Sequence, residues 1–296
     1  MPRIAGLALA ALMVLGFAVP AAAGENSKHD RDNSTLFATG LAATGTHRVL
    51  LAIDVDRGTT TVVGPALPGT LAPTSLALAI TPDGTAAYTI ANSFSATAAQ
   101  LAKINLATGG QTLVGSPIGA DLKIMGMTFS PDGVLYAAGD YVPTSPTFNS
   151  LYTIDLTTGA LTRVGSLGTG PTAMDYIMSF VFDSHGNMYG ASETALYKVH
   201  LPDAKGGEAR TKEAGQGAQA LATKVVGFVG SSLVMGIAIG EDGNFYAADF
   251  VGPLPAVSRI YRVNIKTGLL TPLFKTGIAN VHNIAFNPER QRGHHE

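Results

Sequence analysis

The side chains of this chain that could do chemistry are carboxylates, an imidazole, amides, phenols and one ammonium group in or beside its connecting segments. They are Asp121, Lys123, Asp140, Tyr141, Asp175, Tyr176, Glu193, Asp249, Asn280, His282 and Asn283. A converging carboxylate, imidazole and amide could hold Ca²⁺ or another hard cation. The same groups could orient a sugar hydroxyl, and they could equally be solvated loop residues that cap loop backbone.

Three of these residues are the candidate metal ligands. Asp175, His282 and Asn283 lie beside short apolar strands that the internal repeat places innermost, so we expect them nearest the axis of the molecule. On the same ligand-binding face we expect the other candidates, Asp121, Lys123, Asp140, Tyr176, Glu193 and Asp249. The sequence assigns no cofactor, and Ca²⁺ is the candidate that these residues suggest.

No catalytic signature accompanies these residues. The chain contains no Gly-x-Ser-x-Gly elbow, no His-Glu-x-x-His pair and no phosphate-binding glycine loop with lysine. It has no cysteine, which excludes thiolate metal sites and cysteine nucleophiles. Catalytic residues are therefore unassigned, and the sequence leaves open whether the protein is an enzyme.

The N-terminus has the three-part layout of a secretory signal peptide. Arg3 supplies a basic start, residues 4–19 form an almost unbroken apolar run, and three alanines at 21–23 offer a cleavage site. A membrane anchor is the alternative, but a spanning helix needs about 20 apolar residues and this run is shorter. We predict a signal peptide over 1–23 and a disordered linker over 24–34. No transmembrane segment is expected after cleavage, and the protein should be secreted or periplasmic.

Composition limits the classes of partner. The net charge is −2 and no basic block occurs, so no nucleic acid is expected as a partner. Apolar residues make up 46% of the chain, which is ample for a core, whereas charged residues make up only 14%. Threonine, serine, glycine and asparagine must therefore cover much of the exterior.

Four short phrases recur in fixed order. The first is an apolar strand that ends in Asp or Asn before a Thr-Gly turn, as at 101–109 and 151–159, and the second is a strand that ends in Val-Gly. The third is a short apolar strand that runs into a Pro-Asp-Gly or related turn, and the fourth is the strand that follows, as at 126–138. These are hairpin signals, because Asp or Asn caps the turn and Gly supplies the positive φ.

The fourth phrase is missing at the C-terminus and reappears at the N-terminus, over 36–39. Splitting one sheet between the two termini closes a ring of sheets and so avoids an unpaired edge. The sequence therefore predicts an all-β fold, a β-propeller over 35–288. It should have five four-stranded blades, closed by pairing of the C-terminal inner strand with the N-terminal strand. Six blades is the alternative, and residues 289–296 are predicted to form a flexible tail.

These phrases resemble known propeller repeats. The segment 81–92 resembles the repeat of YVTN-type (YncE-like) bacterial propellers, and 129–136 and 243–249 are similar to repeats of the gluconolactonase and NHL-like groups. The gluconolactonase resemblance implies a divalent cation held by Glu, Asn and Asp at the channel mouth, but that family's early Glu-Gly-Pro phrase does not occur here. Exported propellers of unassigned function with the same phrases are the closer resemblance.

The lengths of the connections between strands indicate which face of the molecule carries a binding site. The Pro-Asp-Gly and Thr-Gly turns share one face, the short-turn face, which an insertion at 202–220 interrupts. The other connections form the opposite, long-loop face and lie at 40–47, 65–74, 92–99, 116–124, 139–149, 166–177 and 249–258. Long loops on a rigid frame usually carry binding sites. We therefore predict a binding module that recognises a glycan, a peptide or a protein through the long-loop face. The alternative is a cation-dependent hydrolase or lactonase at the mouth of the central channel.

Overall fold

The computed structural model describes residues 35–41, 48–64, 76–92, 99–118, 122–202, 220–230, 233–250 and 256–288. All of them belong to one structural unit, Asp32–Glu296. The predicted signal peptide, linker and C-terminal tail, most of the insertion at 202–220, and the candidate Asp121 lie outside the described residues. Within the described part, no helix has the length and apolar character needed to cross a membrane.

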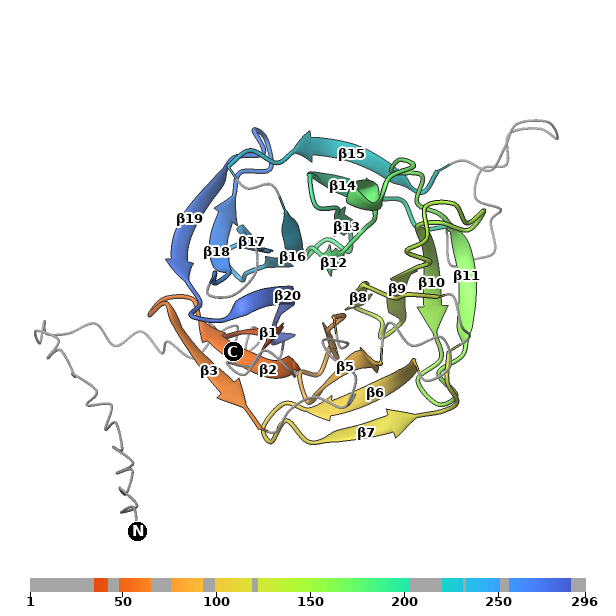
Figure 1. Cartoon of the computed structure of the whole chain (residues 1–296), viewed down its shortest axis with the longest axis horizontal. Helices are drawn as coiled ribbons and strands as arrows, with labels where there is room; N and C mark the ends of the chain where they lie inside the picture. Colours follow the sequence, from red (N-terminus) through yellow and green to blue (C-terminus); the bar gives the residue numbers. More distant parts are fainter. Residues whose placement is uncertain are drawn as a thin grey trace, which may run out of the picture. The chain divides into compact units, whose positions relative to one another are not determined.

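The described residues form five four-stranded antiparallel sheets, arranged as blades around a central axis (Figure 1). From axis to rim, blade 1 comprises β20 (Ala279–Phe286), β1 (Thr35–Leu41), β2 (Arg48–Asp54) and β3 (Thr59–Val63). Blade 2 comprises β4 (Ala79–Ile80), β5 (Ala86–Ala91), β6 (Gln100–Asn105) and β7 (Gln111–Val114). Blade 3 comprises β8 (Gly126–Phe129), β9 (Leu135–Gly139), β10 (Ser150–Ile154) and β11 (Leu161–Ser166).

The remaining two blades follow the same order. Blade 4 comprises β12 (Ser179–Phe182), β13 (Met188–Ala191), β14 (Ala195–Val199) and β15 (Ala222–Gly227). Blade 5 comprises β16 (Val234–Ile239), β17 (Phe245–Asp249), β18 (Arg259–Val263) and β19 (Leu270–Lys275). Among the described residues, one 3-10 turn, η1 (Ala173–Asp175), lies between β11 and β12.

Blade 1 is built from both ends of the described chain. β20, the last strand, is its innermost member and pairs antiparallel with β1, the first strand. This is the closure that the displaced fourth phrase predicted. The prediction of five blades is confirmed, and the six-blade alternative is wrong.

Neighbouring blades contact each other at the rim, where the Val-Gly end of one blade (the second phrase) meets the Thr-Gly turn of the next (the first phrase). Gly115 follows β7 with φ 64°, and a Cβ atom placed there would lie 1.9 Å from the carbonyl oxygen of Thr158, in the Thr-Gly turn of blade 3. The Ser116 amide donates to that same oxygen at 3.2 Å. Between blades 4 and 5 the Val229 amide donates to the Gly268 carbonyl at 2.9 Å. The Val-Gly and Thr-Gly phrases therefore encode blade-to-blade contacts as well as hairpins.

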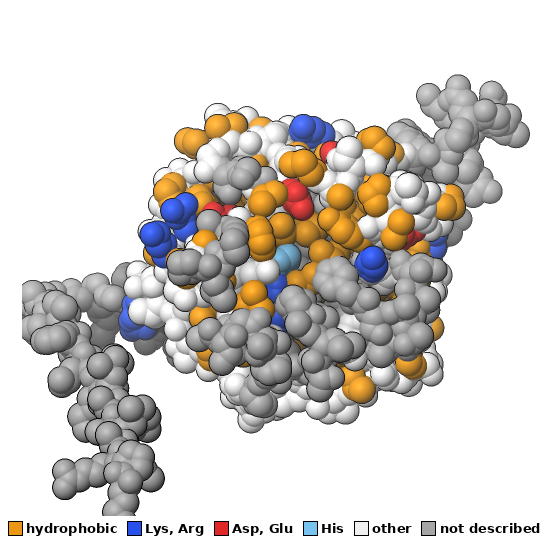
Figure 2. Space-filling view, viewed as in Figure 1, with side chains coloured by type: hydrophobic (Ala, Val, Ile, Leu, Met, Phe, Trp, Pro, Cys, Tyr) orange, Lys and Arg blue, Asp and Glu red, His pale blue; other side chains and the backbone are white. Residues whose placement is uncertain are grey.

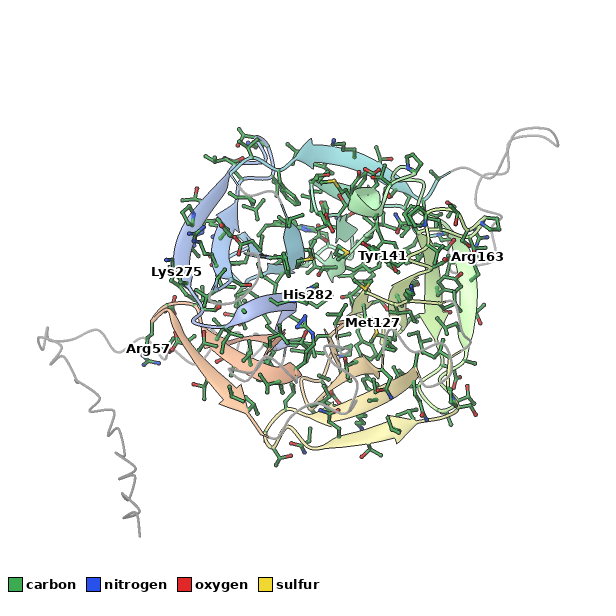
Figure 3. All side chains as sticks on the ribbon, in the orientation of Figure 1. Arg57, Met127, Tyr141, Arg163, Lys275 and His282 are labelled. Carbon is green, nitrogen blue, oxygen red and sulfur yellow. The ribbon has the colours of Figure 1, made fainter. Side chains whose placement is uncertain are left out.

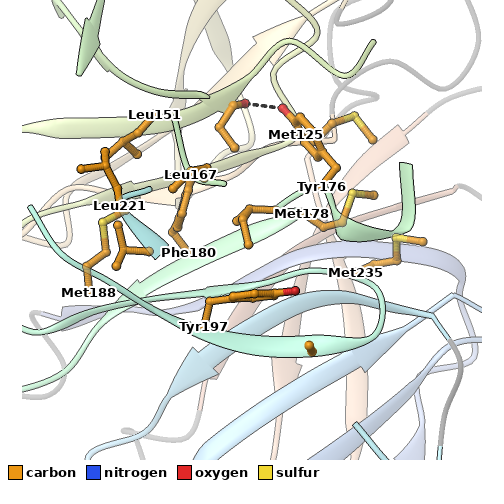
Figure 4. Packing of buried hydrophobic residues seen from close by; sticks show 14 of the residues in the cluster. Met125, Leu151, Leu167, Tyr176, Met178, Phe180, Met188, Tyr197, Leu221 and Met235 are labelled. Carbon is orange, nitrogen blue, oxygen red and sulfur yellow. Dashed lines mark hydrogen bonds between the residues drawn. The ribbon is translucent and has the colours of Figure 1, made fainter. Parts of the chain in front are cut away.

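Apolar side chains fill the space between the blades. One cluster, shown in Figure 4, contains Met125, Tyr176, Met178, Tyr197 and Met235 and so joins blades 3, 4 and 5. Burial of apolar surface contributes roughly 25 cal/mol per Å² to folding. Because the blades are held by their own sheets and by these clusters, they form a rigid frame for the loops.

Candidate functional site

Five residues occupy equivalent positions near the long-loop end of the axis, each four residues before the last residue of its inner strand. We call this set the axial ring: Leu76, Met125, Met178, Met235 and His282. The position that follows holds Ala77, Gly126, Ser179, Gly236 and Asn283. Four blades therefore carry an apolar residue followed by a small one, and blade 1 alone carries His-Asn.

Asn283 occupies the axis itself. It is 1% exposed, and its side-chain nitrogen donates to the carbonyl oxygens of Leu76 at 3.1 Å, Met125 at 2.7 Å and Met178 at 3.0 Å. These acceptors belong to the inner chain of blades 2, 3 and 4. The amide of blade 1 thus links three other blades and fills the axis at this level.

A β-bulge places Asn283 in this position. In the β20–β1 pairing, Ala38 is opposite Ile284 and Thr39 is opposite His282, so Asn283 is an extra residue on β20. Its φ of 39° lies in the left-handed region, which asparagine tolerates better than other residues with a Cβ. Bulges redirect side chains, and here the bulged residue reaches across the axis.

Arg48 is a buried cation beside this bulge. It opens β2, is 3% exposed, and donates from Nη1 to the Asn280 carbonyl at 2.8 Å and from Nη2 to Asn280 Oδ1 at 3.0 Å. Its Nε has no hydrogen-bond partner. The described residues form ion pairs between Arg57 and Asp54 and between Arg262 and Asp242, and none that involves Arg48. Burial lowers the pKa of Arg48 to about 9, so the guanidinium stays charged at neutral pH.

His282 lies near the centre of the ring of blades (Figure 3) and is 5% exposed. Burial, and then the charge of Arg48, hold the pKa of the imidazole well below 6.5, so it is neutral at pH 7. Its Nδ1 is buried without a partner. Figure 2, which looks onto the long-loop face, shows hydrophobic side chains around a central histidine, with a basic side chain beside it. The mouth of the axis therefore combines apolar groups with a neutral imidazole and a buried cation.

Two of the predicted carboxylates are buried but serve their own loops. Asp140 accepts hydrogen bonds from the hydroxyls of Ser145 and Thr147, and so orders the connection from β9 to β10. Asp249 accepts from the backbone amide of Arg259 at 2.7 Å and from the Tyr261 hydroxyl at 2.5 Å. Their oxygens bind protein groups and do not converge on the axis.

Asp175, Tyr176 and Lys123 have structural contacts. Asp175 accepts from the Thr172 amide at 3.2 Å and from the Thr172 hydroxyl at 2.6 Å, which caps η1. Tyr176 has no exposed surface, and its hydroxyl donates to the carbonyls of Ala138 at 2.6 Å (Figure 4) and Lys123 at 3.0 Å. Tyr176 was expected on the binding face; it lies instead in the core beneath it, because its ring fills the space between blades 3 and 4.

Glu193 is the remaining predicted residue, in the β13–β14 turn of the long-loop face. It is 9% exposed, and burial raises the pKa of its carboxyl group. Burial, and then the charge of Glu193, raise the pKa of Tyr141, so the two side chains are close enough to interact. The Glu193 carbonyl accepts from the amide of Val234, directly before Met235 of the axial ring. Glu193 therefore borders the same mouth from blade 4.

The divalent cation that the resemblance implies does not fit these residues. Within the described part of the chain, no three His, Cys, Asp or Glu side chains are grouped so as to hold a metal ion. Asp175 is bonded to Thr172, Asn283 turns its nitrogen and not its oxygen to the three axial carbonyls, and His282 adjoins the charge of Arg48. The predicted ligand set of Asp175, His282 and Asn283 is therefore not assembled.

Sequence reasoning missed Arg48, which the structure brings to the centre of the site. The available signal was an arginine at the head of the otherwise apolar stretch at 48–53. A charge at the start of a buried strand either extends into solvent or needs a specific partner, and this one bonds to the backbone and side chain of Asn280.

No protein-family model matches the chain, and no curated protein matches it by sequence. Solved structures do share its fold. A protein of unknown function from Bacteroides thetaiotaomicron is 17% identical, with 88% of this chain and 64% of that one covered and a TM-score of 0.51. TolB from Acinetobacter baumannii is 10% identical, with 87% and 55% covered and a TM-score of 0.47. A putative 6-phosphogluconolactonase from Bacteroides fragilis is 14% identical, with 84% and 83% covered and a TM-score of 0.43.

The chain spans 48 to 64% of the length of the first structures that it matches. Likeness at these identities concerns the fold and carries no information on ligand or activity. The likeness to the Bacteroides thetaiotaomicron protein concerns the fold alone. The chain is therefore similar to proteins of the β-propeller fold.

Proposed function

We propose that the protein is a binding module, secreted or periplasmic, that takes a glycan, peptide or protein ligand on its long-loop face at the mouth of the axis. One observation carries the proposal: at equivalent positions of the five blades, only blade 1 replaces an apolar-small pair with His282-Asn283, and it adds the buried Arg48. The side-chain nitrogen of Asn283 joins the blades, but Arg48 Nε and His282 Nδ1 have no partner in the fold, so we attribute these two residues to ligand binding.

Energetics support this proposal. Unpaired polar atoms in a protein interior cost about 1–3 kcal/mol each, and Arg48 Nε, His282 Nδ1 and Asn283 Oδ1 are three such atoms. Groups that would be unfavourable for folding alone are concentrated where function requires them. Asn283 fills the axis, so a ligand would approach from the long-loop side only.

The contacts favour binding over the hydrolase alternative. A cation-dependent hydrolase needs carboxylates that converge on one substrate atom, whereas Asp140, Asp175 and Asp249 each bind groups of their own blade or connection. The positive charge of Arg48 also opposes a cation next to His282.

A glycan array and a peptide library, screened with the purified protein, would test the proposal. A bound ligand should lose about tenfold or more in affinity with His282→Leu, which gives blade 1 the residue that blade 2 has at Leu76. The matched control is Lys266→Ala, in an exposed turn of the short-turn face. Ligands that respond to Lys266→Ala and not to His282→Leu would contradict the proposal. Ca²⁺-dependent hydrolysis of lactones would favour the alternative.

A further inference from the structure

The buried polar atoms at the axis that lack a hydrogen-bond partner indicate which kind of ligand group would fit them. Arg48 Nε is an N–H donor on a cation, Asn283 Oδ1 is an acceptor, and His282 Nδ1 belongs to a neutral imidazole that can donate or accept. No carboxylate in the described residues forms an ion pair with Arg48. The complementary ligand group is an anion that accepts hydrogen bonds, with an N–H donor close by.

The surroundings of these atoms define the rest of the ligand. The other four members of the axial ring are a leucine and three methionines, and Figure 4 shows Met125, Met178 and Met235 in a row beside Tyr176. Methyl and thioether groups offer only weak hydrogen-bond partners. A sugar, with hydroxyls on every edge, would leave most of them unpaired against this ring. An aliphatic side chain would lose no hydrogen bonds there and would gain from burial.

We propose that the axial mouth binds the C-terminal carboxylate of a peptide whose last side chain is aliphatic. The carboxylate faces Arg48 and His282, the last amide N–H faces the acceptor on Asn283, and the side chain lies on Leu76 and the ring methionines. This inference rests on the proposed binding function and specifies its ligand class. The last residue of a peptide is the simplest group that carries an anion, a nearby N–H and an apolar side chain together.

The small exposure of the site is compatible with this ligand. The ring residues are 2 to 6% exposed, so a ligand needs some side chains to move. Methionine side chains are unbranched and have three rotatable bonds, so they can change rotamer while the backbone stays in place. Asn283 and Arg48, by contrast, are fixed by hydrogen bonds to carbonyls and to Asn280. The polar side of the mouth is thus preorganised, and its apolar side is adaptable.

The decisive experiment compares two peptides on the wild-type protein. The probes are the hexapeptide Gly-Ser-Gly-Ser-Gly-Leu with a free C-terminal carboxylate and the same peptide as its C-terminal amide, with binding measured by calorimetry. We expect the acid to bind about tenfold or more tightly than the amide, because a hydrogen bond to a charged group contributes more than a neutral one. Hexanoate, an aliphatic acid without a peptide group, should bind more weakly than the peptide acid.

Two charge-removing variants locate the carboxylate. Arg48→Met should remove the preference for the acid, whereas Arg57→Met, which removes an exposed arginine of the β2–β3 turn at the periphery (Figure 3), should leave it unchanged. If Arg48→Met does not fold, the acid–amide comparison on the wild-type protein still decides the question. Equal affinity for acid and amide would overturn the carboxylate assignment. Hexanoate binding as tight as the peptide acid would overturn the peptide assignment. Neither result would contradict the proposed binding function, which fails if the library screen yields no ligand sensitive to His282→Leu.

Discussion

The rim of this propeller has equivalent residues in neighbouring blades, whereas its axis has residues in blade 1 that differ from those of the other four blades. At the rim, the Val-Gly end of one blade meets the Thr-Gly turn of the next, with Gly115 against Thr158 and Gly64 against Thr108. At the axis, four blades present an apolar residue and a small one, and the fifth presents His282 and Asn283. The repeated contacts at the rim join the blades into a closed ring. The different residues of blade 1 at the axis make this blade chemically distinct from the other four.

The two regions also differ in what their contacts achieve. Rim contacts are local and equivalent, so each one joins two neighbouring blades. Asn283 joins blade 1 to blades 2, 3 and 4 at once through a single amide nitrogen. The blade formed by the two chain ends is therefore tied to the rest of the ring at the axis. This coupling provides the rigid polar side that the proposed site requires.

The largest effect is expected at the axis, from Asn283→Asp. A carboxylate would replace the donor nitrogen and face the carbonyl oxygens of Met125 and Met178 in a buried position. We expect a loss of about 4 kcal/mol in the free energy of unfolding, measured by urea denaturation. Asn283→Gly suits the φ of 39° and removes the side chain without introducing charge, so its loss should be about 2 kcal/mol. A loss well below about 1 kcal/mol for Asn283→Gly would show that the amide donors do not hold the blades together, whereas equal losses for the two variants would show only that the buried charge adds no further cost.

An intermediate effect is expected at the rim, from Gly115→Ala. The new Cβ would lie 1.9 Å from the Thr158 oxygen, and the backbone φ is 64°. Strain and overpacking together should lower the free energy of unfolding by about 3 kcal/mol. The control is Gly133→Ala, with φ 88° and no atom within 4 Å of the new Cβ, where only backbone strain of about 1 kcal/mol applies. If the two variants unfold at the same urea concentration, the rim contact is not tight.

The rim could be predicted from sequence because its signals are local and repeated. Thr-Gly and Pro-Asp-Gly turns report their hairpins directly, and the displaced phrase at 36–39 led to the split blade that the structure shows. Five blades followed from counting copies. None of this required knowledge of how distant side chains meet.

The axis could be predicted only in part. His282 and Asn283 were identified as polar residues beside an inner strand, but the bulge that turns Asn283 across the axis depends on the pairing of β20 with β1. Asp140 and Tyr176 were expected on the ligand-binding face because they lie in or beside the long connections. Each bonds to groups that are brought near by the fold, such as Thr147 and Ala138. Arg48 was overlooked because its significance comes from burial, which one arginine in a sequence does not reveal.

The smallest expected effect on the free energy of unfolding is that of His282→Leu, which gives blade 1 an apolar residue in the axial ring, as in the other four blades. The folded-state pKa of His282 lies well below 6.5, so below that pH the unfolded chain binds more protons than the folded chain. The contribution of His282 to stability is therefore complete above about pH 6.5 and is lost as the pH falls toward the folded-state pKa. Leucine does not titrate, and Arg48, the charged neighbour, keeps its proton throughout this range because its pKa is about 9.

The free energy of unfolding should thus fall less steeply between pH 6.5 and 5.5 in His282→Leu than in the wild type. The difference between the two slopes should be about 1 kcal/mol per pH unit, since one proton accounts for at most about 1.4 kcal/mol per unit. Urea denaturation at several pH values would measure it. Met235→Leu is the matched control, because it changes packing at the equivalent position of blade 5 without altering any titrating group. The same slope in His282→Leu and the wild type would mean that the imidazole titrates alike in the folded and unfolded chain. In that case the axis of blade 1 would be open to water, and the buried site inferred from Arg48 and His282 would have to be abandoned.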